Sequence, residues 1–388
     1  MSRMMRLMVS LFLLALLAGC QTIGGWFDGD DEALGPAELV DFEERVEFEE
    51  RWTVKAGDGR DERMGAMRPF HVDGELWVGD HDGEITVVTA DNGRMIRRFE
   101  TDLAISGGPA VYGDLVLVGS FDGGLLALDR STGAERWRAR LSSELLSYPV
   151  MHDGIIVARC IDGRTFGFDP ADGTRLWVYD RSIPLLTLRG NSDPLARAGR
   201  VYLGYDDGAV VSVEVSDGGL SWEQRVSVPE GRSELERLAD IDGPMAVVGS
   251  ELYVVTYAGR MASLAVESGR ILWVKDLASY SGLSLQRTQL AAVDSDDGLW
   301  MIDRRNGSTL WSDDRLARRG LSRPVFVGDY LVVVDAEGYL HAFDRESGAM
   351  VGRRKATRDR PATAPVVVGD TLYLLEDSGR LSAWSLRS

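Results

Sequence analysis

A short pattern of apolar and polar positions recurs along most of the chain. In one copy, an apolar stretch that begins with Pro149 is followed by a turn, the apolar run 155–158 and a second turn at Gly163. A third apolar run, 165–168, precedes a polar turn and a last run that ends in Trp177. Short apolar runs separated by Asp- and Gly-containing turns are typical of antiparallel strands. Each copy therefore predicts four short antiparallel strands.

This unit occurs eight times. One turn glycine marks each copy, at Gly83, Gly123, Gly163, Gly208, Gly259, Gly298, Gly338 and Gly379. A repeat of about 40 residues is typical of propellers and solenoids, and no helical periodicity runs through the span. Four strands per unit and eight units predict an all-β fold, an eight-bladed β-propeller with four-stranded antiparallel blades.

Aromatic residues end most of the units. Tryptophans stand at these positions: Trp52, Trp137, Trp177, Trp222, Trp273 and Trp311. We expect each indole to pack against the next blade, a structural role. Too few residues follow Pro365 for a complete blade, whereas the segment 45–54 precedes the first unit. This N-terminal strand is predicted to complete the last blade and close the ring, which removes exposed strand edges.

Two connections between units are longer than the others, 178–193 and 223–243. Insertions in a repeat fold often gather on a binding face. The first connection is rich in leucine beside an arginine, and the second is amphipathic and acidic. Exposed leucines beside charged groups are typical of protein-binding surfaces. Alternatively, the leucines fill the space between blades and the charges face solvent.

The first residues predict a targeting signal. Arg3 and Arg6 precede the apolar run 7–17 and the sequence Leu-Ala-Gly-Cys, which ends at Cys20. The run is too short for a comfortable membrane span, so residues 1–19 are predicted to be a cleaved signal peptide. The four-residue sequence resembles a bacterial lipoprotein signal, which implies lipidation of Cys20. The alternative is an ordinary signal peptide with a cysteine there by chance.

The net negative charge of the chain argues against a nucleic-acid-binding protein. Lys and Arg total 43 against 61 Asp and Glu, a net charge of -18, which excludes the basic footprint of a nucleic-acid binder. Acidic residues crowd the segment 28–50, and residues 20–44 are predicted to be a lipidated acidic tether in front of a single propeller over 45–388. Gln21, rather than Asp, follows the cysteine, which resembles the outer-membrane sorting rule for lipoproteins.

The lipoprotein signal, the tether, the eight units and above all the sequences 186–190 and 237–242 resemble the BamB family of outer-membrane assembly lipoproteins. The resemblance implies a non-enzymatic scaffold of the β-barrel assembly machinery, anchored by lipid to the periplasmic face of the outer membrane, without cofactor or metal. The implied partners are the POTRA domains of BamA and the other subunits of the machinery; direct binding of nascent outer-membrane proteins stays open. The residues implied to contact BamA are Leu186, Leu188, Arg189, Asp240 and Asp242.

The repeat also resembles the eight-bladed quinoprotein dehydrogenases, which bind pyrroloquinoline quinone and Ca²⁺. That class carries an adjacent cysteine pair and long catalytic insertions, whereas this chain has the lone Cys160 after Cys20 and compact blades. Its histidines fall in different units without metal-ligand spacing, and no catalytic triad, phosphate loop or dinucleotide motif is visible. We therefore predict no catalytic residues and no enzymatic activity, with a quinone-dependent periplasmic dehydrogenase as the alternative.

Overall fold

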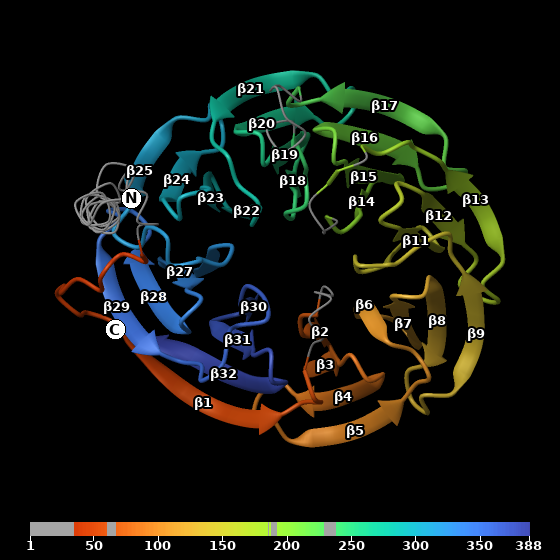
Figure 1. Ribbon diagram of the computed structural model, residues 1–388, viewed down its shortest axis with the longest axis horizontal. Helices are drawn as coiled ribbons and strands as arrows, with labels where there is room; N and C mark the ends of the chain where they lie inside the picture. Colours follow the sequence, from red (N-terminus) through yellow and green to blue (C-terminus); the bar gives the residue numbers. More distant parts are fainter. Residues whose placement is uncertain (1–34, 60–66, 185, 188–191, 229–237) are drawn as a thin grey trace, which may run out of the picture. The chain divides into compact units, whose positions relative to one another are not determined.

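Every strand of the structure belongs to a four-stranded antiparallel sheet. The computed structural model describes residues 35–59, 67–184, 186–187, 192–228 and 238–388. The chain divides into two units, Met1–Pro36 and Ala37–Ser388, and the sheets lie in the second. Eight sheets stand radially around one axis (Figure 1). The predicted all-β, eight-bladed propeller is therefore confirmed.

Seven blades are built from consecutive strands, with the first strand nearest the axis and the fourth at the rim (Figure 1). Blade 1 comprises β2 (Phe70–Val72), β3 (Glu75–Gly79), β4 (Glu84–Thr89) and β5 (Met95–Glu100). Blade 2 comprises β6 (Ile105–Tyr112), β7 (Leu115–Ser120), β8 (Gly124–Asp129) and β9 (Glu135–Arg140). Blade 3 comprises β10 (Val150–His152), β11 (Ile155–Arg159), β12 (Thr165–Phe168) and β13 (Arg175–Tyr179). Blade 4 comprises β14 (Leu195–Arg197), β15 (Arg200–Gly204), β16 (Ala209–Glu214) and β17 (Leu220–Arg225).

The next three blades repeat this order. Blade 5 comprises β18 (Ala246–Val248), β19 (Glu251–Val255), β20 (Arg260–Ala265) and β21 (Ile271–Asp276). Blade 6 comprises β22 (Leu283–Gln286), β23 (Gln289–Val293), β24 (Leu299–Asp303) and β25 (Thr309–Asp313). Blade 7 comprises β26 (Val325–Val327), β27 (Tyr330–Val334), β28 (Tyr339–Asp344) and β29 (Met350–Lys355).

Blade 8 joins the two ends of the propeller. Its inner strands are β30 (Val366–Val368), β31 (Thr371–Leu375) and β32 (Arg380–Arg387), and its rim strand is β1 (Glu47–Lys55). β1 pairs antiparallel with β32, from Glu47 opposite Arg387 to Lys55 opposite Arg380, and the two strands run side by side in Figure 1. The predicted closure of the ring by the N-terminal strand is confirmed.

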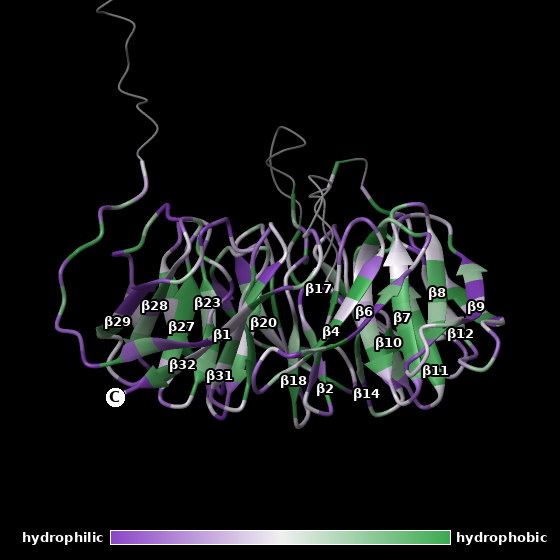
Figure 2. Ribbon diagram, turned by 90° about the horizontal axis from the view of Figure 1, so that it is seen from below, coloured by the Kyte–Doolittle hydropathy of each residue, from purple (hydrophilic) through white to green (hydrophobic). Residues whose placement is uncertain are grey.

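The hydrophobic core is divided among the interfaces between neighbouring blades. The two middle strands of a blade are buried on both faces, as in β27, whereas the rim strand alternates, as in β9. Figure 2 shows the middle strands as the apolar part of the ring. One buried cluster joins blades 3 and 4, and another joins blades 4 and 5. Each blade is therefore held mainly by its two neighbours.

Tryptophans at the ends of blades contact the next blade. The indole nitrogen of each donates a hydrogen bond to a backbone carbonyl there, over 2.8 to 3.1 Å. The pairs are Trp52–Ala90, Trp137–Pro170, Trp177–Val215, Trp222–Val266, Trp273–Arg304 and Trp311–Arg345. Each ring also lies over a turn glycine of the next blade, as Trp177 lies over Gly218. The indoles therefore connect neighbouring sheets by packing and by polar contacts.

The end of the expected tether contacts the propeller. Ala37 donates its N–H to the carbonyl of Ala317, 3.0 Å away, and Arg353 donates to the carbonyl of Val40 at 2.8 Å. Leu39 and Phe42 pack against the buried cluster between blades 6 and 7. The last part of the expected tether of residues 20–44, from 37 onward, thus contacts the ring. It does so because two apolar side chains, Leu39 and Phe42, interrupt the acidic sequence.

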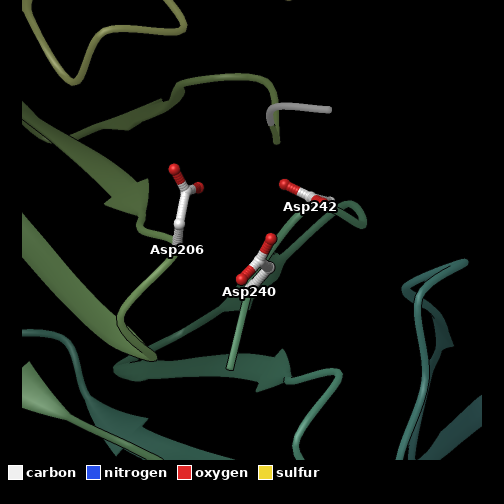
Figure 3. A group of neighbouring side chains, drawn as sticks. All are labelled: Asp206, Asp240 and Asp242. Carbon is white, nitrogen blue, oxygen red and sulfur yellow. The ribbon is translucent and has the colours of Figure 1, made fainter. Parts of the chain in front are cut away.

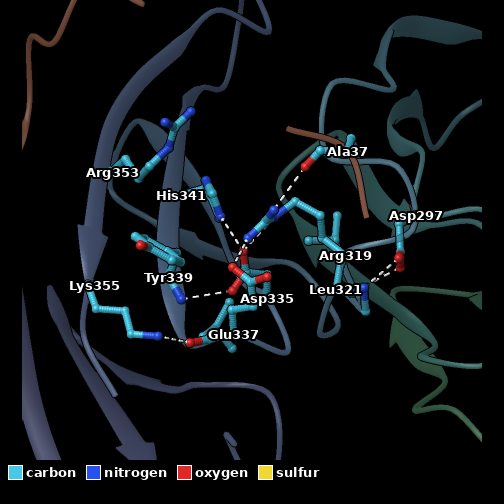
Figure 4. Close-up of polar contacts among 12 residues, drawn as sticks. Ala37, Asp297, Arg319, Leu321, Asp335, Glu337, Tyr339, His341, Arg353 and Lys355 are labelled. Atoms are coloured by element: carbon cyan, nitrogen blue, oxygen red, sulfur yellow. Dashed lines mark hydrogen bonds and ion pairs between the residues drawn. The ribbon is translucent and has the colours of Figure 1, made fainter. Parts of the chain in front are cut away.

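A buried ionic network lies under this contact (Figure 4). Arg319 donates to the carbonyl of Ala37 at 2.9 Å, and it pairs with Asp335 at 2.8 Å and Glu337 at 2.6 Å. The Nε2 atom of His341 lies 3.1 Å from the same Asp335 carboxylate. Burial lowers the pKa of His341 despite this carboxylate. The network therefore links the N-terminal segment to the second and third strands of blade 7.

Within the part of the chain that the structure describes, we find no helix of the length and apolar character needed to cross a membrane.

Candidate functional site

The two long connections both attach to blade 4. The first runs from the end of β13 to β14, and the second runs from the end of β17 to β18. Arg181 holds the start of the first connection, because it pairs with Asp207 at 2.7 Å and with Glu223 at 2.9 Å. Its guanidinium also lies over the ring of Tyr205. The start of the first connection is therefore bound to blade 4.

Leu186 is the one predicted leucine that the structure describes in the first connection. Its side chain is 45% exposed, although it is apolar. Ile183, three residues earlier, packs into the cluster between blades 3 and 4. Leu188 and Arg189 lie outside the described residues. In the second connection, Val228 is likewise apolar and exposed. An exposed apolar side chain is thus present in each connection.

The other two predicted residues, Asp240 and Asp242, lie close together (Figure 3). Their segment is packed into the ring, since Leu238, Ala239 and Ile241 are buried. Asp240 is only 1% exposed, whereas Asp242 is partly exposed. In this structure, therefore, at most one of the two carboxylates reaches the surface.

Asp206, in the turn after β15, completes a group of three carboxylates. One oxygen from each of Asp206, Asp240 and Asp242 lies within 4.8 Å of the others. Burial raises the pKa of Asp242 to about 8, and the neighbouring Asp240 and Asp206 add to this effect. Burial also raises the pKa of Asp206, to about 6. Three carboxylates at this spacing disfavour full ionisation, so the cluster holds protons near neutral pH.

Arg159 is the buried cation beside this cluster. One of its nitrogens lies 3.9 Å from an Asp206 oxygen, and another donates to the hydroxyl of Ser192 at 3.1 Å. Its guanidinium stacks over Tyr205 at 4.5 Å. Ser192 lies at the end of the first connection, and Asp206 faces the end of the second. Arg159 therefore links the described ends of the two connections.

This arrangement suits recognition of a positively charged group. Three carboxylate oxygens at this spacing could accept a guanidinium or ammonium group from a partner, or could hold a metal ion. Arg159 already supplies one positive charge, which disfavours a further metal ion. The Oδ1 atom of Asp242 is buried and accepts no hydrogen bond from the described residues.

Sequence reasoning missed Asp206 and Arg159. Asp206 belongs to a Tyr-Asp-Asp-Gly turn that is indistinguishable from the turns of other units. The sequence around Arg159 could have indicated a buried polar site. The arginine ends the apolar strand β11, and a buried charged side chain needs a polar partner. The histidines of the chain are dispersed, and His341 is committed to the network of blade 7.

Comparisons with known proteins agree with this architecture. The family described as "Outer membrane protein assembly factor BamB" matches residues 81–313 and 303–388. An outer membrane protein assembly factor BamB from Pseudomonas aeruginosa is 37% identical over 320 residues, which are 82% of this chain and 84% of that protein. One from Xanthomonas campestris is 33% identical over 333 residues, 82% of each chain.

Solved structures give the same result at the level of the fold. BamB from Moraxella catarrhalis superposes with a TM-score of 0.80 at 26% identity, over 87% of this chain and 99% of that one. A quinohemoprotein alcohol dehydrogenase from Pseudomonas putida superposes with a TM-score of 0.68 at 12% identity, over 87% of this chain and 76% of that one. At such low identity the second likeness shows the propeller fold alone.

Proposed function

Because the chain belongs to the BamB family of outer membrane protein assembly factors, we propose that it is a non-enzymatic scaffold which binds the periplasmic POTRA domains of BamA. Cys20 carries the lipid that holds it to the periplasmic face of the outer membrane. Bound there, it assists the folding and insertion of outer-membrane β-barrel proteins together with the other subunits of the machinery.

The BamA-binding surface in this proposal is the pair of connections attached to blade 4. The observation that carries it is an exposed leucine, Leu186, on one connection and the partly exposed carboxyl group of Asp242, beside the buried Asp240, on the other. An apolar anchor beside charged groups favours a protein partner, since the apolar side chain supplies area and the charges fix orientation. The proposed surface also includes Leu188 and Arg189 of the first connection, which lie outside the described residues.

Partner capture with matched variants tests the surface. Detergent extracts containing the lipidated protein are used to recover BamA with wild type, Leu186→Glu and Leu220→Glu. Leu220, on rim strand β17, is 55% exposed and serves as the control for the same change. We expect Leu186→Glu to reduce recovered BamA about tenfold, as for a central interface residue, and Leu220→Glu to leave it unchanged. Undiminished recovery with Leu186→Glu, Leu188→Glu and Arg189→Glu would exclude this surface.

Two further measurements test the remaining parts of the proposal. Cys20→Ser is expected to move the mature protein from the membrane fraction to the soluble periplasmic fraction. Addition of pyrroloquinoline quinone and Ca²⁺ is expected to give no dye-linked oxidation of alcohols. Turnover in that assay would contradict the scaffold role and support the dehydrogenase alternative.

A further inference from the structure

A cavity of about 1290 Å³ opens among the strands nearest the propeller axis. Its lining comes from the inner strands or their leading residues in blades 1, 5, 6, 7 and 8, which surround the axis in Figure 1, and from Asp193 ahead of blade 4. Apolar side chains form much of the wall, among them Phe70, Met245 and Phe326. The exposed aromatic ring of Tyr280 also lines it. The cavity is therefore large enough and apolar enough for an organic molecule.

Arginines supply the positive charge of this cavity. Arg68, Arg323 and Arg360 line it, together with the carboxylates of Asp193 and Asp335. Both carboxylates are already engaged. Asp193 pairs with Arg68 at 2.6 Å and accepts the N–H of Tyr148 at 2.7 Å. Asp335 is bound within the network of blade 7. Within the described residues, Arg323 and Arg360 therefore form no ion pair with the acids of the lining.

Arg323 is the residue that distinguishes this cavity. Within the described residues its guanidinium makes one hydrogen bond, to the hydroxyl of Ser284 at 2.6 Å, and no ion pair. A guanidinium carries five N–H donors, so four of them have no protein acceptor there. Burial and repulsion from Arg68 lower the pKa of Arg323 to about 10 despite attraction from Asp193, and Arg323 remains charged at neutral pH. A guanidinium that lines a cavity and has no ion pair favours a ligand that carries negative charge.

We propose that this axial cavity binds a small organic anion, an oxyanion group on an apolar body, with Arg323 as its main polar contact. The fork of N–H donors on Arg323 matches the two oxygens of a carboxylate or a phosphate ester. Arg360 lines the same cavity and adds positive charge, while the aromatic and aliphatic wall accommodates the apolar body. The cavity adjoins the end of the first connection, since Asp193 lines it, but Arg323 and Arg360 belong to the connections on either side of blade 7.

Calorimetric titration with a matched pair of ligands tests the charge requirement. The probes are 2-naphthoate and its neutral analogue 2-naphthamide, which share one apolar body. Wild-type protein is expected to bind the acid at least about tenfold more tightly than the amide, because a charge-assisted hydrogen bond exceeds a neutral one by about this factor. Equal affinity for both, or binding of neither, would overturn the proposal.

Variants then locate the site. Arg323→Gln is expected to weaken 2-naphthoate binding about tenfold or more, and Arg323→Lys, which keeps the charge, to weaken it less. Arg354→Gln removes the same charge from the exposed part of rim strand β29 and serves as the control. If Arg323→Gln binds the acid as wild type does, the assignment is wrong. Should Arg323→Gln fail to fold, Arg360→Gln on the exposed side of the cavity takes its place, with the same two outcomes.

Discussion

The indole nitrogen of Trp177 in blade 3 donates a 2.8 Å hydrogen bond to the backbone carbonyl of Val215 in blade 4. The same ring lies over Gly218, where a methyl group would come within 2.6 Å of a ring carbon. Gly218 has a φ of +71°, a conformation that favours glycine for a second reason. One tryptophan and one glycine thus fit two sheets together, and the arrangement recurs at other blade junctions.

Loss of the indole at this junction is expected to destabilise the ring. Trp177→Phe removes the hydrogen bond and leaves the Val215 carbonyl without its donor, so the free energy of unfolding should fall by about 1–3 kcal/mol. Urea unfolding followed by circular dichroism measures the change. Leu176→Ala, on the exposed neighbouring position of β13, is the control and should have almost no effect. Equal stability of Trp177→Phe and wild type would show that the indole contact contributes little.

Closure of the ring between blades 7 and 8 depends on another close contact. The carbonyl oxygen of Val46 lies 2.5 Å from the position that a side chain at Gly352 would occupy, and that oxygen belongs to backbone. Gly352→Ala should therefore displace the start of β1 and lower the free energy of unfolding by about 1–3 kcal/mol.

Thermal unfolding tests this prediction, with Gly219→Ala as the control because neither glycine has a positive φ. Gly219→Ala meets only the carboxylate of Asp217 at 3.0 Å, a side chain that can move away. A midpoint for Gly352→Ala that matches that of Gly219→Ala would contradict the expected strain at the closure.

The carboxylate cluster predicts a pH dependence of stability. The pKa of Asp242 is about 8 in the folded protein against its ordinary value of 3.8, so the unfolded chain loses this proton first as the pH rises. The folded state then binds more protons, and the contribution of Asp242 to stability falls between about pH 4 and pH 8. Asp242→Asn removes this loss and should raise the free energy of unfolding at pH 8 by on the order of 1 kcal/mol.

Urea unfolding at pH 5 and at pH 8 measures this effect. The difference between Asp242→Asn and wild type should be larger at pH 8, whereas Asp370→Asn in an exposed turn should show no pH-dependent difference. A difference that is equal at both pH values would argue against a protonated cluster.

Arg319 is expected to be the most sensitive position of the N-terminal contact. Arg319→Gln leaves the buried Asp335 with His341 and the N–H of Tyr339 but without its cation, and it removes a donor to Ala37, which should cost about 3–5 kcal/mol of stability. Equilibrium unfolding measures the loss, and limited proteolysis should cut near residues 37–44 more readily than in wild type. The exposed Arg270→Gln is the control for a lost positive charge. Unchanged proteolysis would mean that the packing of Leu39 and Phe42 and the hydrogen bonds from Ala37 to Ala317 and from Arg353 to Val40 hold the segment without Arg319.

Sequence pattern was sufficient for the propeller because each strand and turn is specified within its own unit. The turn glycines and the buried runs such as β27 are local signals that recur in the eight units, and an indole ends six of them. The closure by β1 followed from the incomplete last unit. The carboxylate cluster did not follow, because Asp206 lies in a turn of blade 4 and Asp242 in the connection after that blade, and no spacing along the chain reveals their distance. The absence of an ion pair at Arg323 could not be predicted either, because it depends on the pairing of Asp193 and Asp335 with other arginines in the folded protein.

The pairing of β1 with β32 places the earliest and latest strands of the propeller in one sheet. A chain that is synthesised from its N-terminus contains β1 long before its partner strand exists. Blade 8 is therefore completed only after the whole sequence has been synthesised, and until then β1 presents unpaired backbone groups to its surroundings. Ring closure is consequently a late, post-translational step that requires a full-length polypeptide, and truncated products would remain open arcs with free edges.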